Sequence, residues 1–198
     1  MIDGWHGRVG TFTGVVLITV AILPLAALAA WALARCRIFT GTTPVRAWRT
    51  SLTEVGIVYG TAPWVWMIML PGSRNGAVPG RVSLVPLRDL LTILSGAPLT
   101  VMVQVVGNLL VFATLGLLAP LRFAALASLP RILALAAGCS VLVETAQYVL
   151  RLDRVSSVDD VLLNTAGAAL AALASRRWWH ATAGASSDRP RPAPEPGR

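Results

Sequence analysis

Lysine is absent from this sequence, and charged residues of either sign are scarce. All 17 basic residues are arginine, and charged residues make up 13% of the chain, whereas soluble domains carry about 25%. Hydrophobic residues account for 55% of the 198 positions. This balance excludes an ordinary soluble domain. We expect an all-α integral membrane protein, because helices satisfy their own backbone hydrogen bonds in lipid.

Cysteine and histidine are nearly missing as well, with two of each. Cys36 and Cys139 belong to different hydrophobic stretches, so we expect free thiols and no disulfide framework. His6 and His180 lie near the chain ends, and no His/Cys spacing matches a zinc site. The arginines are scattered between apolar stretches and form no patch with aromatic residues, which argues against nucleic-acid binding. The sequence therefore predicts no metal, no cofactor and no nucleic-acid partner.

Five apolar stretches come close to the length of about 20 residues that a helix needs to cross a bilayer. They cover residues 9–34, 52–70, 99–119, 129–150 and 158–174. We therefore predict a polytopic, multi-pass helical bundle of about five transmembrane helices. It divides into a pair of N-terminal helices over residues 1–81 and a three-helix domain over residues 82–175.

The arginines also predict the orientation of the bundle, since cytoplasmic loops carry an excess of basic residues. The larger share of them falls on one side. That side holds Arg35, Arg37, Arg46, Arg49, Arg122, Arg131, Arg176, Arg177, Arg189, Arg191 and Arg198. We expect it to face the cytoplasm, with the N-terminus outside and an Arg-rich cytoplasmic loop over residues 35–51. Residues 176–198, rich in Ala, Ser and Pro, are expected to form a disordered cytoplasmic tail.

Polar side chains gather in the outer parts of the last three predicted spans. At a rise of about 1.5 Å per residue, they lie at similar depths below the outer surface. Spacings of three and four residues place the members of each span on one helix face. We expect them to line a polar pocket open to the extracytoplasmic side. The members are Asn108, Glu144, Gln147, Arg154, Asp160 and Asn164, and Gln104 shares a helix face with Asn108.

These residues also have a structural interpretation. Ser157 followed by Asp160 is typical of a helix cap, and Asp159 suits the positive end of the helix dipole. Amides between helices can be simple hydrogen-bond partners, each contributing about 0.6 to 2 kcal/mol. Glu144 is harder to explain, because an acid at the centre of a span costs about 2.5 to 3.5 kcal/mol on insertion scales. Its candidate partners are Arg151, Arg154 and Asn108.

Small and aromatic residues carry further expectations. Gly107, Gly116 and Gly167 are predicted where helices approach each other closely. Tryptophans near the ends of the second and fifth spans are expected in interfacial belts. These are Trp64, Trp66, Trp178 and Trp179.

Three segments resemble the VanZ-like family of bacterial membrane proteins. VSLVPLRD, residues 82–89, is similar to the family's Asn-Leu-hydrophobic-Pro-Phe loop. GNLLVFATLG, residues 107–116, is similar to its Gly-Asn-hydrophobic-Phe-x-Pro-x-Gly helix, with Thr114 in place of the Pro. ETAQYVLRLDRVSSVDDVLLNTAG, residues 144–167, resembles its Glu-x-x-Gln, Arg and Asp-x-Asp-Asp-x-x-x-Asn-Thr-x-Gly pattern, with Ser157 where a further Asp is common.

The resemblance implies a bacterial plasma-membrane protein associated with low-level resistance to the glycopeptide teicoplanin, and it leaves the reaction open. In one hypothesis, the polar pocket binds or remodels an outer-leaflet lipid or a lipid-linked wall precursor, with Arg154 meeting a phosphate group. In another, Glu144 is a general base and Asp160 an acid or metal ligand of an intramembrane hydrolase or transferase. A helper subunit of an envelope complex is the third alternative.

Overall fold

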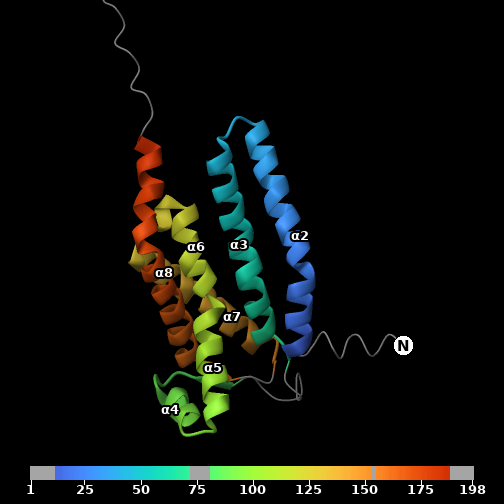
Figure 1. Ribbon diagram of the computed structural model, residues 1–198. Helices are drawn as coiled ribbons and strands as arrows, with labels where there is room; N and C mark the ends of the chain where they lie inside the picture. The colour runs from blue at the N-terminus through green and yellow to red at the C-terminus, as the bar shows by residue number, and fades with distance from the viewer. Residues whose placement is uncertain (1–11, 72–80, 153–154, 188–198) are drawn as a thin grey trace, which may run out of the picture.

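The protein is a bundle of helices with a small patch of β-structure at one end (Figure 1). The computed structural model describes residues 12–71, 81–152 and 155–187. The elements are α2 Phe12–Phe39, α3 Pro44–Ile68, β1 Arg81–Ser83, α4 Arg88–Leu94, α5 Pro98–Val111, α6 Ala113–Arg122, the 3₁₀ turn η1 Ala124–Leu126, α7 Leu129–Val149, β2 Val155–Ser157 and α8 Val158–Ser187. The predicted class, a helical membrane bundle, is confirmed, with two three-residue strands added.

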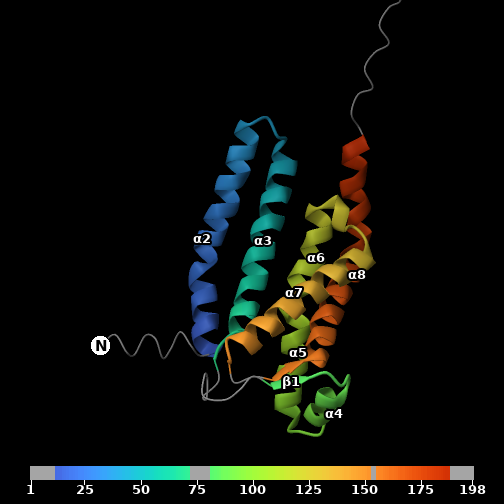
Figure 2. The same ribbon diagram turned by 180° about the vertical axis from the view of Figure 1, so that it is seen from behind.

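The helices form two groups that stand side by side. α2 and α3 are an antiparallel pair, and α3 packs on α6 of the second group (Figures 1 and 2). Within the second group, α8 packs against α5, α6 and α7. α4 and the strands lie at one end of the bundle, which we call the α4 end. The connection between α2 and α3 lies at the opposite end, which we call the turn end (Figure 1).

Four helical segments of the described chain are long and apolar enough to cross a membrane. They are Thr13–Phe39, Val101–Arg122, Leu129–Val149 and Val158–Trp179. They correspond to four of the five predicted spans. The predicted second span, 52–70, is not among them, because α3 is long enough but less apolar than α2 and carries Glu54. α3 nevertheless packs along α2.

Two segments that were expected to be irregular are largely helical. The predicted loop over 35–51 is reduced to residues 40–43, with its arginines on the ends of α2 and α3. Gly41, at φ 92°, ends α2 in a Schellman turn in which the Gly41 and Thr42 N–H groups donate to Ile38 and Arg37 carbonyls. α8 continues to Ser187, so residues 176–187 of the predicted disordered tail are helical. Arginine and alanine are good helix formers, and a helix can outlast its apolar stretch. Residues 188–198 lie outside the described residues.

The predicted third span is two helices rather than one. Phe112, at φ −113° and ψ 12°, leaves helical geometry between α5 and α6. α8 crosses the segment at this break. A Cβ added at Gly167 would lie 1.8 Å from the Leu109 carbonyl oxygen, and one at Gly116 would lie 2.0 Å from that of Ala168. The close approaches predicted at Gly116 and Gly167 are therefore confirmed.

Gly107 does not follow that prediction. Nothing lies within 4 Å of a Cβ added there, so it makes no close helix contact. An unpredicted close approach occurs instead at Gly56 and Gly60 of α3, a small-xxx-small pair facing α6. A Cβ at Gly60 would lie 2.5 Å from the Cγ2 atom of Thr114.

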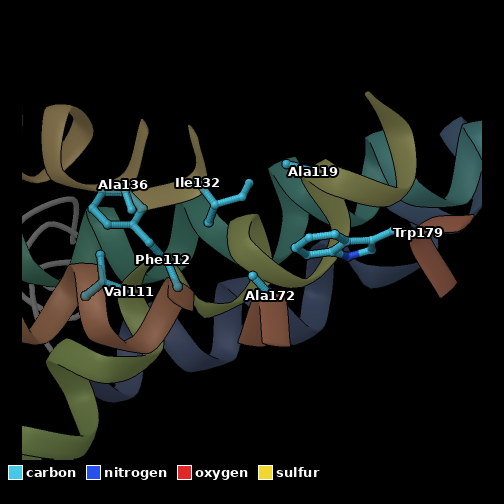
Figure 3. Packing of buried hydrophobic residues seen from close by; sticks show 8 residues of the cluster. Val111, Phe112, Ala119, Ile132, Ala136, Ala172 and Trp179 are labelled. Carbon is cyan, nitrogen blue, oxygen red and sulfur yellow. The ribbon is translucent and has the colours of Figure 1, made fainter. Parts of the chain in front are cut away.

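A cluster of buried side chains from α5 to α8 forms the core (Figure 3). Its members are Val111, Phe112, Ala119, Ile132, Ala136, Ala168, Ala172 and Trp179. Trp179 was expected in an interfacial belt, but it is only 7% exposed. Its indole N–H donates to Ser175 Oγ at 3.0 Å, which satisfies the polar atom inside the bundle. Its neighbour Trp178 is exposed and lies against the Arg177 guanidinium.

Candidate functional site

Two short parallel strands join the segment before α4 to the start of α8. β1 and β2 pair with Val82 opposite Ser156 and Ser83 opposite Ser157. The strands are three residues long and far apart in sequence, so the alternation of polar and apolar residues does not predict them. Their pairing places the segment before α4 over the polar residues of α7 and α8.

Ser157 connects three parts of this end of the bundle. Its N–H donates to Glu144 Oε2 at 3.1 Å, and its hydroxyl donates to Asp89 Oδ2 at 2.6 Å. The same hydroxyl oxygen accepts the Asp159 N–H at 3.1 Å, so the predicted cap of the last helix is present. In a capping box, Asp160 would accept the Ser157 N–H. Glu144 accepts it here, and Asp160 turns to a different partner.

The Asp159 carboxylate caps a helix other than its own. Its two oxygens accept the N–H groups of Leu87 at 2.6 Å and Leu90 at 2.9 Å, at the start of α4. Leu87 is held at φ 66°, in the left-handed region. Asp159 is only 3% exposed. Asp159 lies in the first turn of its own helix, as predicted, and its carboxylate in addition fixes α4 against α8.

Glu144 and Gln147 of α7 are both buried, at 8% and 6% exposure. Gln147 Nε2 donates to the Ile68 carbonyl at 2.8 Å and so caps the C-terminus of α3. The Ser156 hydroxyl donates to the backbone carbonyl of Glu144 at 2.9 Å. These bonds tie α7 to α3 and to β2.

Two amides complete the polar group. Asn108 Nδ2 donates to Asp160 Oδ1, which joins α5 to α8. Asn108 was a candidate partner of Glu144, and its amide meets Asp160 instead. Asn164 Nδ2 donates to Ser140 Oγ at 2.8 Å. Asn164 is 1% exposed, and its Oδ1 has no hydrogen-bond partner.

The predicted polar residues surround one pocket with a volume of about 880 Å³. This volume falls within the range of about 300 to 1,000 Å³ for small-molecule sites. Its lining is Met67, Ile68, Leu70, Pro71, Leu99, Val103, Gln104, Gly107, Asn108, Glu144, Gln147, Val155, Asp160 and Asn164. All the predicted members that the structure describes are in this lining, and Arg154 lies outside the described residues. Gly107 faces the hollow, which explains the open space around it.

Asp89 lies next to the pocket residues through its contact with Ser157, and the sequence did not indicate this position. Hydrogen bonds from Ser157 and then Ser83 hold the pKa of Asp89 below its ordinary value, and the charge of Arg88 acts in the same direction. No group of three His, Cys, Asp or Glu side chains in the described parts of the chain is arranged to hold a metal ion.

A second cluster of charged side chains lies toward the turn end, where three helices meet. Glu54 of α3 accepts hydrogen bonds from Arg37 of α2 and from Arg122 of α6, the latter at 2.6 Å. Arg37 also donates to Ser51 Oγ. In the sequence, Glu54 is a lone acid in an apolar stretch. Its arginine partners lie 17 and 68 residues away, so the sequence does not predict this cluster.

The comparisons with known proteins identify one family. The VanZ/LLP1 family model matches residues 57–179, from within α3 to Trp179 in α8. The matched stretch is longer than the resemblance at residues 82–174, and it contains the described polar residues around the pocket. No curated protein and no solved structure matched the chain. Because the family model covers more than half of the chain, this membrane protein belongs to the VanZ/LLP1 family.

Proposed function

We propose that the pocket binds the polar headgroup of an outer-leaflet lipid or of a lipid-linked wall precursor. The observation that carries this proposal is Asn164, a residue of the pocket lining whose buried Oδ1 atom has no hydrogen-bond partner. A buried acceptor without a partner costs about 1 to 3 kcal/mol. A ligand N–H or O–H group would remove that cost, and the hydroxyl and amide groups of sugars and peptides supply such donors.

The mixed lining supports an amphipathic ligand. Amides and carboxylates come from α5, α7 and α8, while Met67, Leu99 and Val103 supply apolar walls. Such sites fix a ligand by a few placed polar groups and bury the rest against hydrocarbon. In this proposal, Arg154 adds a cation for a phosphate group.

We place the pocket in the outer half of the bacterial plasma membrane. The arginines at the ends of α2, α6 and α8 support this orientation, since they gather toward the turn end and basic residues favour the cytoplasmic side. The α4 end then faces outward. Holding such a lipid or precursor there would change how teicoplanin docks at the membrane, in keeping with the phenotype that the family resemblance implies.

An intramembrane hydrolase or transferase is the alternative, because Glu144 and Asp160 line the same pocket. Both carboxylates accept hydrogen bonds within the fold, from the Ser157 N–H and from the Asn108 amide. We therefore favour binding over catalysis. Turnover of an envelope lipid by the purified protein, lost in Glu144→Gln, would establish the alternative.

The proposal is tested by teicoplanin susceptibility of a sensitive bacterium that expresses the wild type or Asn164→Leu, with vancomycin as the comparator. Thr165→Val is the matched control, because Thr165 Oγ1 is also buried without a partner but does not line the pocket. We expect protection in the wild type and the control, and loss of protection in Asn164→Leu at an equal membrane level. Glu144→Gln and Asp160→Asn are expected to weaken it.

Two results would contradict the proposal. Protection that persists in Asn164→Leu would remove the pocket from the function. Loss of the Asn164→Leu protein from the membrane together with its protection would assign Asn164 to helix packing.

A further inference from the structure

A second hollow, apolar in character, lies between α2 and α3 beside the polar pocket. Its volume is about 310 Å³. We call it the α2–α3 groove. It is lined by Val15, Val16, Thr19 and Val20 of α2, by Tyr59, Gly60, Pro63, Trp64 and Met67 of α3, and by Thr114 of α6. Met67 also lines the polar pocket, so the groove and the pocket share a wall.

The hydroxyl groups of Thr19 and Tyr59 at the groove are bonded within the protein. The Tyr59 hydroxyl donates to the Thr19 carbonyl at 2.7 Å, and the Thr19 hydroxyl donates to the Val15 carbonyl at 2.7 Å. These bonds use the polar atoms that α2 and Tyr59 would present. Hydrocarbon is therefore the occupant that suits the groove.

The groove and the pocket follow each other along α3. Tyr59 precedes Met67 by two turns, which is about 12 Å at a rise of 1.5 Å per residue. α3 runs from the turn end to the α4 end (Figure 1). A ligand with its headgroup in the pocket would therefore extend its tail past Met67 toward the middle of the bundle, as the tail of a bilayer lipid does.

We propose that the α2–α3 groove binds an unbranched acyl chain of a membrane lipid, the tail of the same molecule whose headgroup occupies the polar pocket. This inference rests on the proposed function and narrows its ligand class to an acyl lipid. The Tyr59–Thr19 hydrogen bond joins the α3 and α2 walls of the groove and limits how far they can separate. An unbranched acyl chain is the slimmest hydrocarbon tail in a bilayer, and it fits such a slot better than a methyl-branched prenyl chain.

The proposal also assigns a role to α2. This helix lies before the matched stretch 57–179 and contributes one whole wall of the groove. In this member of the family, α2 then serves as a tail-binding element as well as a membrane span.

The test uses the purified full-length chain in detergent and phosphatidylglycerol that carries a diazirine in one acyl chain. We compare Val20→Trp, which fills the groove, with Leu17→Trp. Both positions lie on α2 and are similarly exposed, at 62% and 64%, but Leu17 does not line the groove. We expect cross-links to α2 and α3 residues of the groove in the wild type and in Leu17→Trp, and a loss of about tenfold in Val20→Trp, equivalent to 1.4 kcal/mol. Val16→Phe provides a second groove-filling variant if Val20→Trp does not reach the membrane.

The outcomes separate this inference from the proposed function. Equal cross-linking in all variants, while Asn164→Leu still abolishes teicoplanin protection, would overturn the groove inference alone. Displacement of the probe by polyisoprenyl phosphate, but not by unlabelled phosphatidylglycerol, would overturn the acyl assignment in favour of a prenyl tail. Protection that persists in Asn164→Leu would overturn the headgroup proposal itself.

Discussion

The two ends of the bundle treat buried polar groups differently. Toward the turn end, Glu54 accepts hydrogen bonds from two arginines, and Arg37 also donates to Ser51. At the α4 end, Asn164 keeps an unpartnered oxygen beside a pocket of about 880 Å³. A cluster that only holds helices together is satisfied by its own members. An unsatisfied acceptor beside open space points to a ligand.

The α4 end itself contains both kinds of group. Asp159 caps α4, and Gln147 caps α3, so these side chains hold the helices that form the pocket. Asn164 lines the pocket, and its Nδ2 atom donates to Ser140 of α7 while its Oδ1 atom has no partner. In the proposed function, structural and binding roles are therefore divided between atoms of one side chain as well as between residues.

The largest expected effect on stability distinguishes Gly167, which packs against a neighbouring helix, from Gly107, which faces open space. Gly167→Ala should lower the free energy of unfolding by about 3 kcal/mol, the upper end for overpacking, because its Cβ would meet the Leu109 backbone carbonyl. Gly107→Ala should change it by less than about 0.5 kcal/mol. Thermal unfolding in detergent measures both. Equal melting temperatures would show that α8 does not cross α5 as closely as described.

Removing the shared acid of the turn-end cluster should have the next largest effect. Glu54→Gln should lower the free energy of unfolding by about 2 kcal/mol, because charged hydrogen bonds to two arginines are weakened. The same melting assay, with Thr53→Ser on the same helix as control, measures the loss. An unchanged melting temperature would mean that solvent screening cancels the stabilising contribution of the Glu54–arginine interactions.

Removing the unpartnered amide should have a smaller effect on stability. Asn164→Leu loses the Ser140 hydrogen bond but also removes a buried, unsatisfied acceptor, so the free energy of unfolding should change by less than about 1 kcal/mol. Thermal unfolding beside Glu54→Gln checks this. A loss as large as that of Glu54→Gln would erase the distinction between the two ends.

The smallest expected effect is the pH dependence at Asp89. Its folded-state pKa is lowered from an ordinary value of 3.8, so its stabilising contribution is present above that value and is lost as the pH falls through the folded-state pKa. Asp89→Asn should flatten the decline of the melting temperature with acidification in this range. A decline equal to that of the wild type would assign the acid sensitivity to other carboxylates.

The sequence predicted the polar set well and its connections less well. Spacings of three and four residues placed Glu144 with Gln147, and Asp160 with Asn164, on shared helix faces, and the structure brings them to one pocket. The sequence also predicted the helix cap at Ser157. The Asp159 contact to α4 was not, because it joins residues far apart in the chain.

The break at Phe112 and the turn-end cluster were missed for related reasons. Nothing in the residue type of Phe112 indicates a helix break. The break lies where α8 crosses the segment, which the sequence does not show. Glu54 looked like an isolated acid until Arg37 and Arg122 approached it from two other helices. Local sequence does not predict contacts between side chains of different helices.

The sequence by itself determined that this chain is a helical membrane protein of its family, because hydrophobic content, span length and the motif of residues 144–167 are local properties. Tertiary structure alone decided which carboxylate caps which helix, which glycine packs and which faces open space, and which amide atom has no hydrogen-bond partner. These outcomes depend on the distances between helices, and hydrogen bonds and close contacts act only over a few ångströms.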